Sequence, residues 1–386
     1  MELDLSWILL GVPIVFALGW LASRLDLRQL RIENRQAPKA YFKGLNYLLN
    51  EQQDQAIDAF IEAVQKDPDT SELHFALGSL FRRRGEYERA VRVHEHLLSR
   101  ADLSKVDRDR AQHALAQDFL KAGLLDRAEE ALRKLDDTQY QEQAWLTLLA
   151  LHERARDWDQ AGAAARRLQQ AGQGDFSARL AHYQCELAAN ALNKQKDPQA
   201  ARQLLDRAVQ DAPTAARPRI QLAGLLTGQD DLRGAFDQLV ELARHAPQAL
   251  PLVASELVRI GQATGQLTRA AALLQQGYAA APSVDVADAL VQAQLVGGAP
   301  VHEAREGYVR HMTQEPSLIA ATRWLSHEPF AQEGAHPVVQ RSLEHAARPL
   351  ARYRCAACGF EAQGYFWQCP GCQAWESFPP KRIEEL

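Results

Sequence analysis

The pattern of apolar and polar residues begins with an uninterrupted apolar run, residues 5–23, which contains no charged side chain. As a helix, these 19 residues would span about 28 Å, close to the ~30 Å hydrocarbon thickness of a bilayer. Trp7 and Trp20 fall near its two ends, where indole rings favour the membrane interface. The run therefore predicts a transmembrane helix. A cleaved signal peptide and a buried core helix are the alternatives.

The charges on either side of this run predict its orientation. Glu2 and Asp4 precede it, whereas the segment 24–36 that follows is basic. A signal peptide begins with basic residues, so the acidic start favours an uncleaved anchor over residues 1–23. Because cationic flanks stay in the cytoplasm, we expect a single-pass protein with a periplasmic N-terminus and a cytoplasmic bulk.

From residue 37 onward, the apolar positions recur with a helical period inside a longer period of about 34 residues. An alanine marks each unit, and in most units a leucine or an aromatic residue follows four positions later. Eight alanines fit this register: Ala56, Ala90, Ala128, Ala161, Ala201, Ala235, Ala270 and Ala304. Such units resemble tetratricopeptide repeats, each a pair of antiparallel helices whose alanine lets the helices approach closely.

We therefore predict an all-α solenoid of about eight to nine helical pairs, because paired helices bury their apolar faces only by stacking on neighbouring pairs. The repeats occupy residues 37–318, and residues 319–350 form capping helices.

The first helix of each pair is expected to line a concave, partner-binding groove. Repeat positions 5, 9 and 12 share one face of that helix because they are four and three residues apart. Amides such as Asn190 and Asn193 are poor helix formers, but in a groove they can pair with a peptide backbone. The alternative is that these are ordinary solvated helix residues. The candidates are Phe75, Arg82, Arg83, His113, Lys121, Arg154, Glu186, Asn190, Asn193 and Lys194.

Charge and motifs argue against two other classes of function. The 386 residues carry a formal net charge of −5, without the basic surplus typical of nucleic-acid binding. The sequence contains no G-x-x-x-x-G-K-[ST], H-E-x-x-H or G-x-S-x-G motif, and we predict no catalytic residue. His94 and His96 form the densest histidine cluster, but His94 occupies a packing position of its repeat.

Chemistry is concentrated in the last segment, residues 351–386. Cys355 and Cys358 form one C-x-x-C pair, and Cys369 and Cys372 form a second pair ten residues later. This spacing predicts a tetrahedral four-thiolate site for one structural metal ion, with zinc the first choice and iron the alternative. Free thiols this close together also indicate a reducing compartment. Cys185 falls in a helical pattern and is predicted to be a small buried residue.

The order of these segments resembles the lipopolysaccharide assembly protein B family of Gram-negative bacteria, with a rubredoxin-like module at the C-terminus. Two departures from ordinary rubredoxins, the ten-residue spacing and Gln373 in place of a glycine, favour a structural ribbon over an electron carrier.

The resemblance implies a regulator in the inner membrane that faces the cytoplasm. Such a protein brings the deacetylase of the lipid A pathway to a membrane-anchored, ATP-dependent zinc metalloprotease, and contacts other envelope-assembly proteins of that membrane. The alternatives are a metal-based redox or metal-sensing protein and a scaffold that acts without proteolysis. The sequence leaves open whether the chain forms a homo-oligomer.

Overall fold

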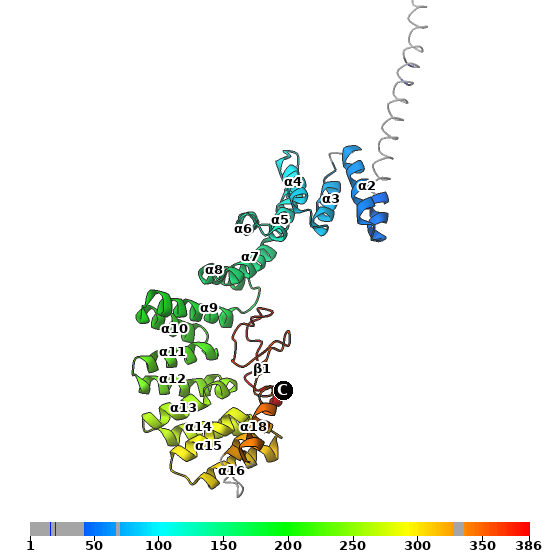
Figure 1. Ribbon diagram of the computed structural model, residues 1–386. Helices are drawn as coiled ribbons and strands as arrows, with labels where there is room; N and C mark the ends of the chain where they lie inside the picture. The colour runs from blue at the N-terminus through cyan, green and yellow to red at the C-terminus, as the bar shows by residue number, and fades with distance from the viewer. Residues whose placement is uncertain (1–15, 17–19, 21–41, 67–69, 327–335) are drawn as a thin grey trace, which may run out of the picture. The chain divides into compact units, whose positions relative to one another are not determined.

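The computed structural model describes residues 16, 20, 42–66, 70–326 and 336–386 (Figure 1). The predicted membrane anchor and basic segment lie outside these residues, apart from Phe16 and Trp20, which are helical and exposed. Within the described residues, no helix combines the length and the apolar character that a membrane crossing requires. The chain divides into two compact units, Met1–Leu151 and His152–Leu386.

The first unit consists of short helices in succession, and each apolar face packs on its neighbours. Phe60, Leu77 and Phe81 lie in one buried cluster, and Leu115, Phe119 and Leu132 lie in the next. After a helix at residues 42–49 come α2 (Gln53–Lys66), α3 (Ser71–Arg83), α4 (Tyr87–Ser99), α5 (Lys105–Ala122), α6 (Leu125–Arg133) and α7 (Gln141–Ala155), whose last residues belong to the second unit.

The second unit continues the pattern of helical pairs around a larger core. Two irregular turns interrupt it, a π-helical turn η1 and a 3-10 turn η2. The helices are α8 (Trp158–Gln170), α9 (Ser177–Asn190), η1 (Ala191–Gln195), α10 (Pro198–Asp211), α11 (Ala216–Gly228), α12 (Leu232–His245), η2 (Pro247–Leu252), α13 (Ala254–Ala263), α14 (Leu267–Ala280), α15 (Val284–Val296), α16 (Val301–Gln314), α17 (Leu318–Ser326) and α18 (His336–Ala347).

A small ribbon, residues 351–386, completes the second unit. Its strands β1 (Tyr353–Arg354) and β2 (Glu361–Ala362) pair antiparallel, with Tyr353 opposite Ala362. A 3-10 turn, η3 (Ile383–Glu385), ends the chain. In Figure 1 the ribbon lies beside the ends of the helices from α9 to α18.

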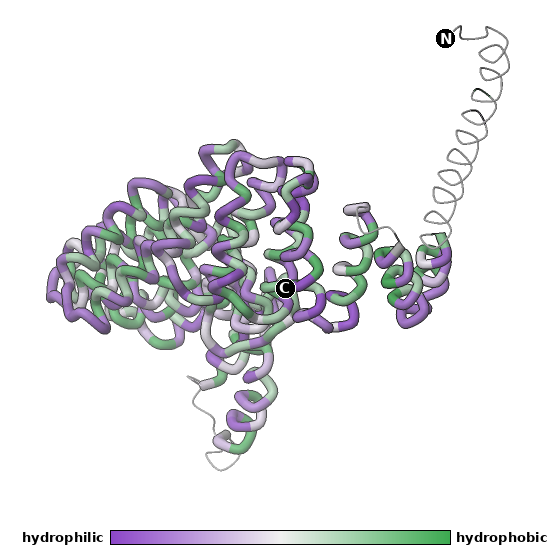
Figure 2. The backbone as a smooth tube through the Cα atoms, turned by 90° about the horizontal axis from the view of Figure 1, so that it is seen from above, coloured by the Kyte–Doolittle hydropathy of each residue, from purple (hydrophilic) through white to green (hydrophobic). Residues whose placement is uncertain are grey.

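The eight marker alanines explain why the helices of a pair pack so closely. Each of them is at most 2% exposed. A methyl group at this position allows the backbones to approach while it loses no side-chain entropy. Apolar and polar stretches alternate along the coils of Figure 2, as helices with one buried face require. The predicted array of helical pairs is confirmed for the described residues.

Candidate metal centre

The first C-x-x-C turn is built by backbone hydrogen bonds next to strand β1. The N–H of Cys355 donates to the carbonyl of Phe360 (2.9 Å), and the N–H of Gly359 donates back to the carbonyl of Cys355 (2.9 Å). Gly359 has φ +77°, the left-handed conformation in which a glycine is least strained. The turn therefore holds Cys355 and Cys358 on one side of a tight loop.

The second turn repeats this arrangement with a different residue type. The N–H of Cys369 donates to the carbonyl of Ala374 (2.9 Å), and the N–H of Gln373 donates to the carbonyl of Cys369 (2.8 Å). Gln373 has φ +62°, so it adopts the left-handed conformation of Gly359 although it carries a side chain. The departure from the rubredoxin pattern at this position changes the residue but not the backbone. It therefore gives no argument against iron.

The four sulfurs fit a single tetrahedral ion. Their Sγ atoms all lie within 4.8 Å of one another, with Cys355 3.8 Å from Cys372 and Cys358 3.6 Å from Cys369. Metal–sulfur bonds of about 2.3 Å would place the corners of a tetrahedron roughly 3.8 Å apart. Disulfides require about 2.05 Å, so these pairs are not disulfides. The four cysteines are thus positioned to bind one metal ion, as the spacing predicted.

Local hydrogen bonds favour the thiolate form of Cys355, whereas at Cys358 the hydrogen bond from the N–H of Phe360 is outweighed by burial and the neighbouring thiols, which raise the pKa to about 12. Burial acts to raise the pKa of the Cys355 thiol. Hydrogen bonds with Ser377 and with the backbone N–H groups of Cys358 and Ala357 oppose it and lower the pKa to about 6. A thiolate at neutral pH binds a cation without first releasing a proton.

The coordination set is closed, and its exposure is uneven. Cys355 and Cys369 are each 1% exposed, whereas Cys358 and Cys372 face solvent. Four thiolates fill a tetrahedral shell and leave no position for a water or a substrate, so the geometry suits a structural ion. Zinc and iron both accept such a cage.

Trp375 anchors the ribbon on the helices of the second unit. Its ring stacks on His182 (centroids 4.8 Å apart) and meets Trp158 and Tyr183 edge-on (6.0 Å each). Its Nε1–H donates to Oε1 of Glu153 (2.9 Å), an oxygen that also accepts the hydroxyl of Tyr183. The indole therefore fills an aromatic site and satisfies its single donor there.

A second polar contact lies next to this site. His182 Nε2 is 3.1 Å from Oε1 of Glu376, across 194 residues of sequence. Burial lowers the pKa of His182 below its ordinary value. The hydrogen bond from the imidazole in turn lowers the pKa of the Glu376 carboxyl. A neutral imidazole that donates to a carboxylate fits both shifts.

The last residues of the chain cap two helices. Glu385 accepts a hydrogen bond from the N–H of Val284 (2.7 Å), the first residue of α15. Glu384 accepts from the hydroxyl of Ser317 and from the N–H of Leu318 (3.1 Å), the first residue of α17. Carboxylates at helix N-termini satisfy free N–H groups and complement the helix dipole. The tail thus caps α15, whose own Ser283 makes no capping hydrogen bond, and adds to the cap of α17, where the Ser317 hydroxyl already accepts from the N–H of Ala320 (2.9 Å).

Arg382 adds a third contact between the C-terminal tail and the helices, beside those of Glu384 and Glu385. Its guanidinium donates to both carboxylate oxygens of Asp285 (2.7 and 3.2 Å) and to the carbonyl of Ala351 (2.7 Å). The same group lies 4.3 Å from the ring centroid of Tyr353. A half-buried, bidentate pair of this kind is more stabilising than an exposed ion pair. The ribbon is therefore fixed to the helices at two separate places.

Comparison with known proteins agrees with this architecture. The lipopolysaccharide assembly protein B of Escherichia coli strain K12 is 30% identical over 388 residues, and the match covers 98% of each chain. The chain belongs to the lipopolysaccharide assembly protein B family. The Haemophilus influenzae member is 26% identical over 407 residues, with 99% of each chain covered.

Single domains match as well. The profile of the rubredoxin metal binding domain matches residues 353–380, and that of the tetratricopeptide repeat matches residues 43–94. Among solved structures, Naa15/Naa10 bound to HypK-THB is similar, with a TM-score of 0.43 and 13% identity. That match covers 82% of this chain and 48% of the other.

The groove candidates of the first unit differ in how far their side chains are exposed to solvent and in whether internal contacts hold them. Phe75 is 6% exposed and packs under the guanidinium of Arg110 (4.1 Å to the ring centroid). His113 is half-buried and stacks on the ring of Tyr140 (4.6 Å). Arg82 is held by internal hydrogen bonds, whereas two other candidates are exposed, Arg83 and Lys121.

The candidates of the second unit lie on α7, on α9 and in the π-helical turn after α9. Glu186 accepts a hydrogen bond from Arg217 (2.6 Å), and Asn190 is half-buried. The other three are exposed: Arg154, Asn193 and Lys194. A partner-binding role for either set stays a prediction.

Sequence analysis missed a buried charge in the first unit. Asp118 is 0% exposed, with its carboxylate 2.5 Å from Nδ1 of His94 and 2.7 Å from a guanidinium nitrogen of Arg82. The His94 ring also fills the space that a Cβ on Gly78 would need (2.5 Å). His94 is thus a packing residue, as predicted. The sequence around Asp118 does not predict its burial, because its partners Arg82 and His94 come from other helices.

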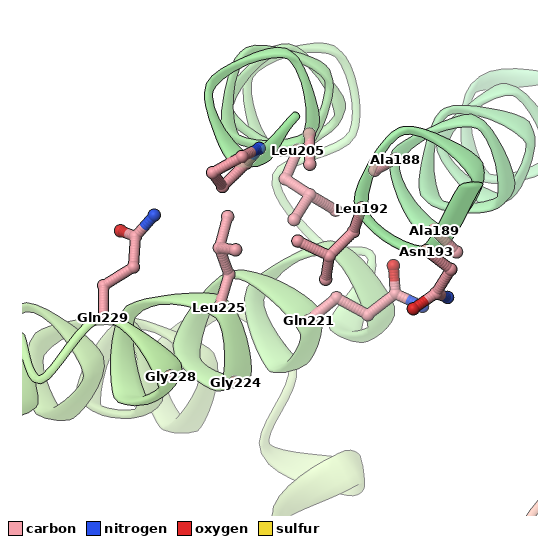
Figure 3. A pocket seen from close by; sticks show the side chains of 12 residues that line it. Ala188, Ala189, Leu192, Asn193, Leu205, Gln221, Gly224, Leu225, Gly228 and Gln229 are labelled. Atoms are coloured by element: carbon pink, nitrogen blue, oxygen red, sulfur yellow. The ribbon is translucent and has the colours of Figure 1, made fainter. Parts of the chain in front are cut away.

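The second unit also contains a cavity of about 500 Å³ that sequence analysis did not predict (Figure 3). It lies between the end of α9 with η1, the start of α10 and the second half of α11. Of the groove candidates, Asn193 lines it. The twelve lining residues are Ala188, Ala189, Leu192, Asn193, Pro198, Ala201, Leu205, Gln221, Gly224, Leu225, Gly228 and Gln229.

Proposed function

We propose that this chain is a cytoplasm-facing adaptor of the inner membrane that regulates lipopolysaccharide biosynthesis. Residues 1–23 anchor it with the N-terminus in the periplasm. The helical repeats hold the deacetylase of the lipid A pathway and present it to a membrane-bound, ATP-dependent zinc metalloprotease that degrades it. The observation that carries the proposal is the match to lipopolysaccharide assembly protein B over 98% of both chains.

The geometry supports a binding role without catalysis. A closed thiolate cage offers no open coordination position, and aromatic and carboxylate contacts hold the ribbon against the helices. Stacked helical pairs present long surfaces for protein partners. A membrane anchor would raise the effective concentration of a client near a protease in the same membrane, without any new contact.

The deciding experiment measures the half-life of the deacetylase in cells with and without this chain. We expect a several-fold longer half-life when the chain is deleted, with recovery when the full chain is restored. If the half-life of the deacetylase is unchanged but the two proteins co-purify, the proposal is wrong and the chain acts as a scaffold without proteolysis.

A charge-reversal variant tests the binding surface. Arg83→Glu is the better choice than a change at Arg82, because Arg82 pairs with the buried Asp118 and its loss would disturb folding. Arg92→Glu is the matched control, since Arg92 lies on α4 with its side chain 77% exposed. We expect Arg83→Glu to weaken the pull-down of the deacetylase more than Arg92→Glu does. Equal effects would remove this face of α3 from the proposal.

A metal-based redox or sensing role is the second candidate. Gln373 keeps the backbone of the rubredoxin turn, so the cage remains compatible with iron. Iron in the purified chain with a reversible reduction would favour this role. One equivalent of zinc without a redox response would exclude the redox role.

A further inference from the structure

The cavity between α9, α10 and α11 has features of a binding site. Its volume of about 500 Å³ lies within the roughly 300 to 1,000 Å³ that is typical of ligand sites. The three leucines that line it converge from three elements, Leu192 from η1, Leu205 from α10 and Leu225 from α11 (Figure 3). Leu192 is 38% exposed, so its apolar side chain is left partly uncovered.

Two glycines in α11 remain unexplained by packing within the chain. A Cβ on Gly224 or Gly228 would meet no atom within 4 Å. In contrast, a Cβ on Gly277 would lie 2.3 Å from Leu250, and one on Gly307 would lie 2.8 Å from Val291. A helical glycine costs about 1 kcal/mol relative to alanine. Gly224 and Gly228 therefore keep the floor of the cavity open at a cost in helix stability.

The lining specifies the chemistry of the occupant. Charged residues make up 24% of the chain, yet none of the twelve lining residues is charged. The three leucines form the apolar centre, and Pro198 is also among the lining residues. Asn193 and Gln221 lie at one end of it and Gln229 at the other (Figure 3). An amide side chain both donates and accepts hydrogen bonds, as a peptide backbone does. The lining thus complements an uncharged segment with one large apolar side chain.

The ribbon leaves this end of the helices open. It contacts α9 through His182 and Tyr183, in the first half of the helix, whereas the cavity is lined from Ala188 onward. No residue of the ribbon lines the cavity. A partner segment can therefore reach the site while the ribbon stays docked.

We propose that this cavity anchors an extended, uncharged segment of a partner protein. One leucine, isoleucine, methionine or phenylalanine of that segment enters among Leu192, Leu205 and Leu225. The amides of Asn193, Gln221 and Gln229 pair with its backbone. The inference rests on the proposed adaptor function and specifies the chemistry of one recognised segment.

The test uses the full chain in lipid nanodiscs and a bead-displayed pentapeptide library with acetylated and amidated ends. Gly224→Leu fills the cavity, and leucine also has a higher helix propensity than glycine, so the variant should melt at or above the wild-type temperature. Gly224→Ala adds a single methyl group. Ala279→Leu is the matched control, because it adds a leucine to an exposed position of α14 outside the lining.

We expect peptides that bind the wild type to share one large apolar residue and to lack charged residues. In fluorescence anisotropy, their affinity should fall at least tenfold for Gly224→Leu. It should change less than threefold for Gly224→Ala and Ala279→Leu. The proposal is overturned if no peptide distinguishes the wild type from Gly224→Leu, or if the shared residue is charged. It is also overturned if decyl maltoside occupies the cavity and no peptide does.

These outcomes are separate from those of the adaptor proposal. The deacetylase half-life does not depend on the peptide selection, so a failed selection beside a lengthened half-life would remove only this anchor site. Unchanged deacetylase turnover beside a successful selection would leave the site with a different partner.

Discussion

The two ends of helix α9 have different surroundings. Its first half carries His182 and Tyr183, which the ribbon covers with Trp375 and Glu376. The residues of its last turn and of the π-helical turn after it that line the open cavity are uncharged: Ala188, Ala189, Leu192 and Asn193. At the covered end, the buried His182 imidazole pairs with the Glu376 carboxylate of the ribbon. At the open end, no charged residue lines the cavity.

The same contrast extends to the later helices. The N-terminal ends of α15 and α17 receive carboxylates from Glu385 and Glu384, so the chain itself closes that edge of the second unit. In a solenoid, each repeat contacts only its neighbours, so repeats can shift relative to more distant ones. The ribbon and tail contact helices from several repeats and therefore restrain such shifts. The comparison therefore predicts that the ribbon stiffens one edge of the second unit and leaves the cavity accessible.

Removing the metal should have the largest effect, because it unfolds the ribbon that covers the first half of α9. Cys369→Ser removes a buried ligand, and structural thiolate sites contribute roughly 10 to 16 kcal/mol of apparent binding free energy. We expect bound metal to fall from one equivalent to near zero and the ribbon to unfold, while the helical circular dichroism changes little. Mass spectrometry of the metal and hydrogen exchange of residues 351–386 measure both effects.

Cys185→Ala is the matched control for this experiment. Cys185 is 0% exposed inside the helical core and is not one of the four clustered thiols, and burial raises the pKa of its thiol to about 12. This variant should keep one equivalent of metal. Retention of the metal by Cys369→Ser would contradict the assigned ligand set.

Loss of Trp375 should open the covered end without releasing the metal. Trp375→Ala removes three ring contacts and the hydrogen bond to Glu153, and we expect docking to weaken by about 2 to 4 kcal/mol. Hydrogen exchange should increase in the first half of α9 and in the ribbon, with the metal content unchanged. Phe360→Ala, at a position 40% exposed, is the control that should leave exchange in α9 unaltered. Equal protection of α9 in the two variants would contradict the anchoring role of Trp375.

The features that sequence analysis predicted are those with local signals. The alanine at each repeat recurs because a close helix pair requires it, and all eight positions are buried. Each C-x-x-C pair occupies one tight turn, so the spacing alone predicts that the four thiols gather at one site. Short-range periodicity and spacing thus predicted the helical pairs, the clustering of the four cysteines and the burial of Cys185.

The features that were missed depend on contacts over long sequence distances. His182 meets Glu376 across 194 residues, and Glu384 caps a helix 66 residues earlier in the chain. No periodicity marks such pairs. The cavity depends on a π-helical turn after α9 and on Gly224, and a single helical glycine in the sequence does not reveal whether its surroundings are packed or open.

Acid should weaken the covered end, and this is the smallest of the expected effects. Burial lowers the pKa of His182 from its ordinary 6.5, and the hydrogen bond from His182 lowers the pKa of Glu376 from 4.5. Both groups bind protons more readily when the ribbon is undocked. Their contribution to docking is therefore full above about pH 6.5 and declines as the pH falls, first through His182 and then through Glu376.

The neighbours of His182 and a conservative variant make this prediction specific. The charged groups that face the ring are Glu376 from the ribbon, Arg217 from α11 and Glu186 from α9. His182→Gln keeps a donor for Glu376 but cannot titrate. The near-ultraviolet circular dichroism of the docked tryptophans should give a melting temperature that falls between pH 7 and pH 5 in the wild type and stays nearly constant in the variant. An equal slope in both proteins would assign the acid sensitivity to groups other than this imidazole, because the glutamine removes only its proton binding.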